Sequence, residues 1–189
     1  MNLKKYFSYI LLFVSFSTLA GDFRSSDWGD SISKTKTLES AELVGQDADA
    51  LYYKTSIASI EMLTFFSYLN DALYSGAYLS QEKYMNKNRF IDDYNKISKL
   101  LTKKYGKPSV EDIIWLDEDS YYKDERNNWG LAISMGELLM RAIWKTDTTT
   151  IINGLRGDNF ELNHVIFYEE LASKERVQKL EEEKDLDLL

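Results

Sequence analysis

The sequence predicts an α+β protein in which a twisted antiparallel sheet carries helices on one face. Apolar side chains alternate with polar ones in short runs separated by turn residues, as expected for strands joined in meanders. Only two stretches have helical spacing, and each precedes a group of strands. This order argues against a parallel βαβ sheet with its nucleotide crevice. It predicts one domain at 21–170, compatible with two tandem helix–meander units at 21–82 and 88–170.

The first half is predicted to hold a short helix and three strands. Ser31 is a suitable N-cap for a helix ending near Glu42, and Gly45 then begins a loop. Asn70 and Asp71 form a two-residue hairpin signal between the second and third strands. The strands are expected at 50–57, 59–69 and 72–80.

The second half begins with the clearest helix, Arg89–Tyr105. Its apolar residues recur at spacings of three and four, which places them in one stripe: Phe90, Tyr94, Ile97, Leu101 and Tyr105. Gly106 supplies a C-terminal cap, and Pro108 prevents continuation. An acidic, aromatic loop is expected at 117–128. Strands are expected at 110–116, 129–135, 137–145, 149–156 and 160–169.

The first twenty residues have the pattern of a secretory signal peptide. Lys4 and Lys5 precede an apolar run at 6–16, and Thr18 and Ala20 are small residues suited to cleavage before Gly21. The run is too short to span a bilayer, which needs about 20 apolar residues. We therefore expect a periplasmic or secreted protein without a membrane anchor, ending in a charged tail at 171–189.

Composition narrows the classes of partner. The formal net charge is −8, and removal of Lys4 and Lys5 makes it more negative. An acidic chain is poorly suited to nucleic acid or to anionic lipid. The sequence contains no cysteine, so neither a disulfide nor the lipid-bearing cysteine of a bacterial lipoprotein is expected. No cofactor is predicted.

Several short motifs, at 23–31, 104–108 and 129–132, resemble those of a family of small exported bacterial proteins. Phe23-Arg24-x-x-x-Trp28-Gly29-x-Ser31 resembles the start of small exported bacterial proteins with no assigned function, and the resemblance continues through 104–108 and 129–132. The helix-then-meander plan is more distantly similar to β-lactamase inhibitor proteins and to small outer-membrane assembly lipoproteins. Those folds serve protein recognition, which the resemblance implies here without assigning any residue a role.

Catalytic signals are weak. His164 is the only histidine, and no nucleophile elbow or Gly-rich phosphate loop accompanies it. A structural histidine is therefore favoured over a general base, and no catalytic residue is predicted. A small carboxylate-dependent hydrolase remains an alternative, because many acidic residues are present. Zinc is disfavoured, since one histidine without cysteine does not build the usual site.

The acidic loop offers oxygen ligands for calcium. Asp117 and Asp119 are the candidate ligands, although the loop lacks the spacing of an EF-hand. The default interpretation is a solvated acidic loop, so no metal site is predicted. A calcium- or glycan-binding envelope protein is kept as a further alternative.

Aromatic residues on the strands give the leading hypothesis. Tyr68, Tyr74, Tyr78 and Trp144 lie on predicted strands, and an antiparallel sheet covered on one side leaves its other face partly in water. Aromatic residues exposed there would form a recognition surface. For the individual residues, the favoured interpretation is that they pack across strands inside the core. The sequence thus favours a non-catalytic module that binds a protein partner or forms a homodimer.

Overall fold

A computed structural model describes residues 21–175 and 177–179. The predicted signal peptide and most of the charged tail lie outside these residues. The elements are α1 (Ile32–Leu38), β1 (Glu42–Gln46), β2 (Ala50–Ile57), β3 (Ile60–Leu69), β4 (Ala72–Ser80), α2 (Asn88–Tyr105), β5 (Val110–Trp115), η1 (Tyr121–Asp124), η2 (Arg126–Asn128), α3 (Trp129–Ser134), β6 (Leu138–Lys145), β7 (Thr149–Asp158) and β8 (Glu161–Glu170).

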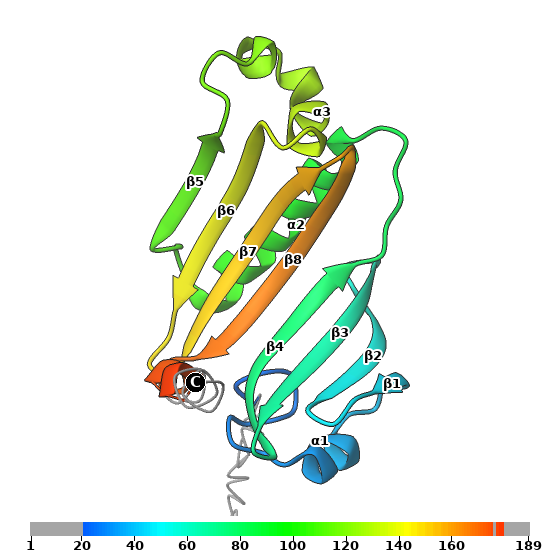
Figure 1. The fold of residues 1–189 in the computed structure, drawn as a ribbon, viewed down its shortest axis with the longest axis vertical. Helices are drawn as coiled ribbons and strands as arrows, with labels where there is room; N and C mark the ends of the chain where they lie inside the picture. Colours follow the sequence, from blue (N-terminus) through cyan, green and yellow to red (C-terminus); the bar gives the residue numbers. More distant parts are fainter. Residues whose placement is uncertain (1–20, 176, 180–189) are drawn as a thin grey trace, which may run out of the picture.

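Eight strands form one antiparallel sheet, in the order β1-β2-β3-β4-β8-β7-β6-β5. Two four-stranded meanders therefore meet at a central seam, where β4 pairs with β8 (Figure 1). The α+β class with an antiparallel sheet is confirmed. None of the helices among the described residues is long and apolar enough to cross a membrane.

Helix α2 covers one face of the second meander. Its predicted stripe is buried at Phe90, Tyr94, Ile97 and Leu101, and it runs behind β6, β7 and β8 in Figure 1. Gly106 ends the helix with φ of 84°, which explains the need for glycine there. Because α3 packs beside α2, both helices lie on the same side of the sheet. The face of β5–β8 turned toward the viewer is not crossed by a helix.

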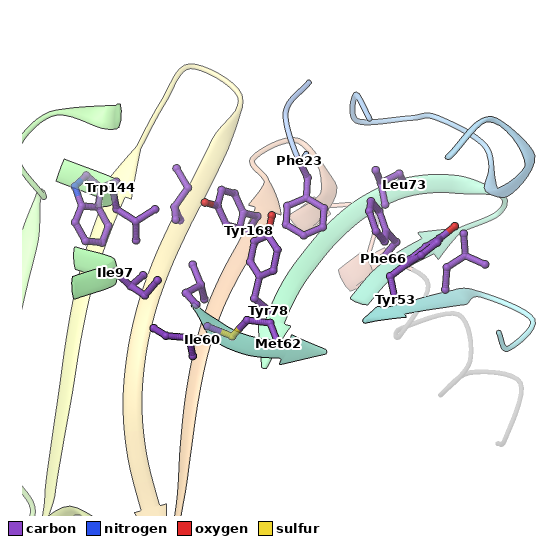
Figure 2. Close-up of a cluster of buried hydrophobic side chains, with 14 of the residues drawn as sticks. Phe23, Tyr53, Ile60, Met62, Phe66, Leu73, Tyr78, Ile97, Trp144 and Tyr168 are labelled. Atoms are coloured by element: carbon purple, nitrogen blue, oxygen red, sulfur yellow. The ribbon is translucent and has the colours of Figure 1, made fainter. Parts of the chain in front are cut away.

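The segment before α1 joins the two meanders at their seam. Phe23 is 1% exposed, and its ring centroid lies 5.0 Å from that of Phe66 on β3 and 5.1 Å from those of Tyr78 on β4 and Tyr168 on β8. Figure 2 shows Phe23 pointing into this ring cluster. Trp28 adds a further link, since its Nε1 donates to Thr149 Oγ1 on β7 at 2.9 Å. One short segment thus contacts both halves of the sheet.

Two segments differ from the sequence prediction, one at 39–46 and one at 129–134. The first helix ends at Leu38, and the expected loop around Gly45 begins inside strand β1. Residues 129–134 form helix α3 where a strand was expected. The short apolar run there fits either element, and packing decides it: Gly130 N donates to Asn88 Oδ1 at 2.7 Å, which places α3 against the start of α2.

Gly76 is required by the position of Phe23. A Cβ on Gly76 would lie 2.2 Å from Cδ1 of the Phe23 ring, which three other rings enclose. We expect Gly76→Ala to lower the free energy of unfolding by about 1–3 kcal/mol through overpacking, as measured by urea denaturation.

Gly154 on β7 provides the matched control. A Cβ there would meet only the carbonyl oxygen of Val165, at 3.9 Å. Because glycine weakens a strand interior, Gly154→Ala should leave the free energy of unfolding unchanged or raise it by about 0.5–1 kcal/mol. Equal stability of the two variants would contradict the packing of Phe23 against Gly76.

Candidate functional site

An apolar row crosses the uncovered face of the sheet. Seven strands each place one side chain in it, at directly paired positions: Tyr52, Phe65, Ala77, Phe167, Ile152, Ile143 and Val110. Each of these residues is partly exposed. With neighbouring strands about 4.8 Å apart, the row is roughly 29 Å long. Since a sheet face turned to water usually carries polar side chains, this apolar row is the candidate functional site.

Charged side chains border the apolar row on both sides. Glu169 and Lys145 lie in the next set of paired positions along the strands in one direction. In the other direction the set includes Lys54, Arg141 and Asp112. The Arg141 guanidinium lies 2.8 Å from the Asp112 carboxylate. Further apolar side chains lie between these charges: Leu63, Leu79 and Val165.

Three of the four aromatic residues proposed from the sequence lie in the core. Tyr68, Tyr78 and Trp144 are 3%, 8% and 1% exposed, and burial raises the pKa of Tyr68 to about 12. Figure 2 shows Tyr78 and Trp144 in the buried cluster, with Tyr78 beside Phe23. Tyr74 is partly exposed. Tyr68, Tyr78 and Trp144 therefore cannot form the proposed recognition surface: they pack across strands inside the core, which is the interpretation that the sequence favoured.

The aromatic residues that do reach the uncovered face lie on β2, β3 and β8. Tyr52 and Phe65 stack edge to face, with ring centroids 5.2 Å apart, and Phe167 lies on β8. Along β3 the side chains alternate between the two faces of the sheet, and in the sequence both alternating groups are mainly apolar. That character did not show which of the two groups is buried in the core.

His164 is closed to solvent. It is 0% exposed, and its Nε2 lies 2.8 Å from Asn153 Oδ1. The Asn153 amide nitrogen donates to the Tyr94 carbonyl at 3.1 Å and to Ser98 Oγ at 2.8 Å, which ties β7 to α2. Burial lowers the pKa of His164 to about 4. This arrangement supports the structural interpretation of His164 over that of a general base.

The acidic loop folds onto itself. Asp119 N donates to Asp117 Oδ1 at 2.9 Å, and Ser120 Oγ donates to Glu137 Oε2 at 2.6 Å. Within residues 21–175 and 177–179, no group of three or more candidate metal ligands occurs. The structure therefore offers Asp117 and Asp119 as exposed loop carboxylates and does not gather them into a site.

The residues of the N-terminal motif have structural roles. Arg24 pairs with Glu39 after α1, with Nη2 to Oε1 at 3.0 Å. Gly29 has φ of 88°, a conformation that favours glycine. Ser31 is the predicted N-cap, and its side chain accepts from Lys34 N at 3.2 Å. With Phe23 and Trp28 at the seam, the motif fixes the lead-in segment, which accounts for it without a ligand.

Comparison with known proteins identifies no relative. No family model, no curated protein and no solved structure matches the chain. The resemblance to small exported bacterial proteins stays a prediction. Function is therefore inferred from the geometry of the uncovered sheet face.

Proposed function

We propose that the chain is a non-catalytic protein-binding module whose recognition surface is the apolar row. The observation that carries this proposal is the row itself: seven consecutive strands turn partly exposed apolar side chains to the same uncovered face. Large contiguous apolar patches are uncommon on proteins that have no partner. A face of this kind gains free energy when a second surface excludes water from it.

The border of the apolar row favours a protein as the occupant. Lys145 and Glu169 flank one side, and Lys54, Arg141 and Asp112 flank the other. An apolar centre enclosed by charges of both signs is typical of protein–protein interfaces. An anionic lipid surface or a nucleic acid would instead require an excess of basic residues, and the chain has a net charge of −8.

The proposal also includes export of the protein and a plan of two tandem helix–meander units. Export to the periplasm or medium is supported by the signal-like residues 1–20. Cleavage before Gly21 would leave Phe23, which packs at the seam, as the third residue of the mature chain. A plan of two tandem helix–meander units is supported by the element order, because a helix precedes each meander and the last strands of the two meanders pair.

The test removes apolar contacts from the row without touching the core. The double variant Phe65→Ser, Phe167→Ser changes β3 and β8 on the uncovered face only. We expect the unaltered protein to self-associate in sedimentation equilibrium or to retain one defined protein from envelope extract. The double variant should weaken that association at least tenfold, because two aromatic anchors are lost.

Exposed apolar residues outside this face give the control. Leu116 and Tyr121 are 61% and 79% exposed in and near the acidic loop. The double variant Leu116→Ser, Tyr121→Ser should bind as the unaltered protein does. Two results would overturn the proposal: equal binding by the face variant, or a monomer that retains no protein at any concentration tested. Self-association would identify the partner as a second copy of the chain.

A further inference from the structure

A hollow of about 390 Å³ lies on the uncovered face of the second meander. It is formed where β6, β7 and β8 run side by side (Figure 1). Gly154 is at its centre, because β7 presents no side chain at this position. The apolar side chains around it are Leu139, Ile152, Val165 and Phe167. The volume is within the range of about 300–1,000 Å³ that small-ligand sites occupy.

Nothing among residues 21–175 and 177–179 accounts for glycine at position 154. It lies within ten-residue strand β7, and its pairing with Arg141 and Val165 continues without a register shift. Its φ is outside the left-handed region, and an added Cβ would meet no atom closer than 3.9 Å. A glycine inside a strand weakens it and often marks close approach by a ligand or another backbone. At Gly154 the only open side is the hollow.

Two guanidinium groups stand at the hollow, those of Arg141 and Arg156. Arg141 is already paired with Asp112, at 2.8 Å. Arg156 is exposed and has no ion-pair partner among the residues that the structure describes. Asn163, paired with Arg156 across β7 and β8, adds an uncharged amide. The hollow therefore combines apolar walls with one unpaired cation and has no carboxylate in its lining.

We propose that this hollow binds a free aliphatic carboxylate, with the hydrocarbon chain over Gly154 and the carboxylate at Arg156. A guanidinium matches a carboxylate through two parallel hydrogen bonds, which a neutral or cationic head group cannot accept. The hydrocarbon chain gains free energy from the apolar walls on either side of the glycine. This site shares Ile152 and Phe167 with the apolar row, but carboxylate binding there does not require that the row binds a protein.

The experiment titrates the purified, ¹⁵N-labelled protein with octanoate and decanoate below their micelle concentrations. We expect shifts confined to the amides of Gly154 and its neighbours on β6 and β8, with saturation. Each added methylene should tighten binding by up to about fourfold if it is fully buried. Decyltrimethylammonium, which has the same chain and the opposite charge, should bind at least tenfold more weakly.

Variants separate the hollow from a general affinity for apolar chains. Gly154→Val fills the hollow, and its Cβ clears the backbone, so the variant should fold and lose at least tenfold in decanoate affinity. Arg156→Gln should weaken decanoate binding by about tenfold and remove the preference for the anion. Ser67→Val places the same valine side chain on the uncovered face on β3, outside the hollow, and should change nothing.

Several outcomes would overturn the proposal. They are an unchanged spectrum with decanoate, equal affinity for the ammonium compound, and full decanoate binding by a folded Gly154→Val variant. Tighter binding of an acetylated and amidated Leu-Glu-Leu peptide at the same amides would also overturn it, because the occupant would then be a protein segment.

Discussion

Phe23→Ala is expected to lower the free energy of unfolding by about 3–5 kcal/mol, the range for removing a fully buried phenylalanine. The ring is 1% exposed and contacts aromatic rings from β3, β4 and β8. Since β4 and β8 belong to different meanders, the cavity would open at the seam that joins them. Urea denaturation followed by far-UV circular dichroism measures the change.

A matched control separates burial from the loss of a phenyl ring as such. Phe160, in the turn between β7 and β8, is 61% exposed. Phe160→Ala should change the free energy of unfolding by no more than about 0.5 kcal/mol. Comparable effects of the two substitutions would show that Phe23 does not pack at the seam.

The parts of the fold that the sequence predicts are those with local signals. The stripe of Phe90, Tyr94, Ile97 and Leu101 predicts α2, and Gly106 marks its end. The hairpin at Asn70 and Asp71 is also local, and both residues adopt positive φ as a tight turn requires. In each case the periodicity or the turn residue alone determines the element.

The parts that the sequence does not predict depend on contacts between distant segments. Residues 129–134 become helical where Gly130 meets Asn88, 42 positions earlier in the chain. Strand β1 consists largely of exposed residues and is held by pairing with β2. A local sequence pattern does not predict such pairing, because neither strand's sequence specifies its partner or the register between them.

Three of the four aromatic residues that the sequence proposed for the uncovered face lie in the core instead. On β3, Met62, Phe66 and Tyr68 are buried in the core cluster, and Leu63 and Phe65 lie on the opposite face. Both alternating sets are apolar, so binary patterning cannot assign them, and a shift of one residue exchanges the two faces. The assignment comes from the core cluster around Phe23, which buries one set and leaves the other partly exposed.

His164 is expected to make stability depend on pH between about 6.5 and 4. In the folded protein its pKa is lowered to about 4 by burial, whereas the ordinary value of an exposed histidine is about 6.5. As pH falls below 6.5 the unfolded chain binds a proton that the folded protein does not, so stability is lost until the folded pKa is reached. The full loss is about 3 kcal/mol. The free energies of unfolding measured by urea denaturation at pH 7.5 and at pH 4.5 should differ by most of this amount.

The hydrogen bonds of His164 explain why protonation is costly. Asn153 uses its amide nitrogen for Tyr94 and Ser98 on α2, so its oxygen accepts a hydrogen bond from His164 Nε2–H. Within the described residues, Nδ1 has no hydrogen-bond partner. A second proton would therefore place an unpaired charge in the core, where desolvation is expensive.

His164→Gln isolates the contribution of the imidazole, because the glutamine amide can donate to Asn153 Oδ1 and does not titrate. We expect the variant to be less stable at pH 7.5 and to show a flatter dependence of stability on pH between 6.5 and 4.5. The carboxyl groups whose pKa values are shifted do not produce the same difference in pH dependence between the variant and the unaltered protein. The lowered pKa of Glu39, paired with Arg24, moves its loss of stability to lower pH, and the raised pKa of Asp93 from burial opposes the trend. An unchanged pH dependence in the variant would mean that His164 is protonated without cost, which its closed environment contradicts.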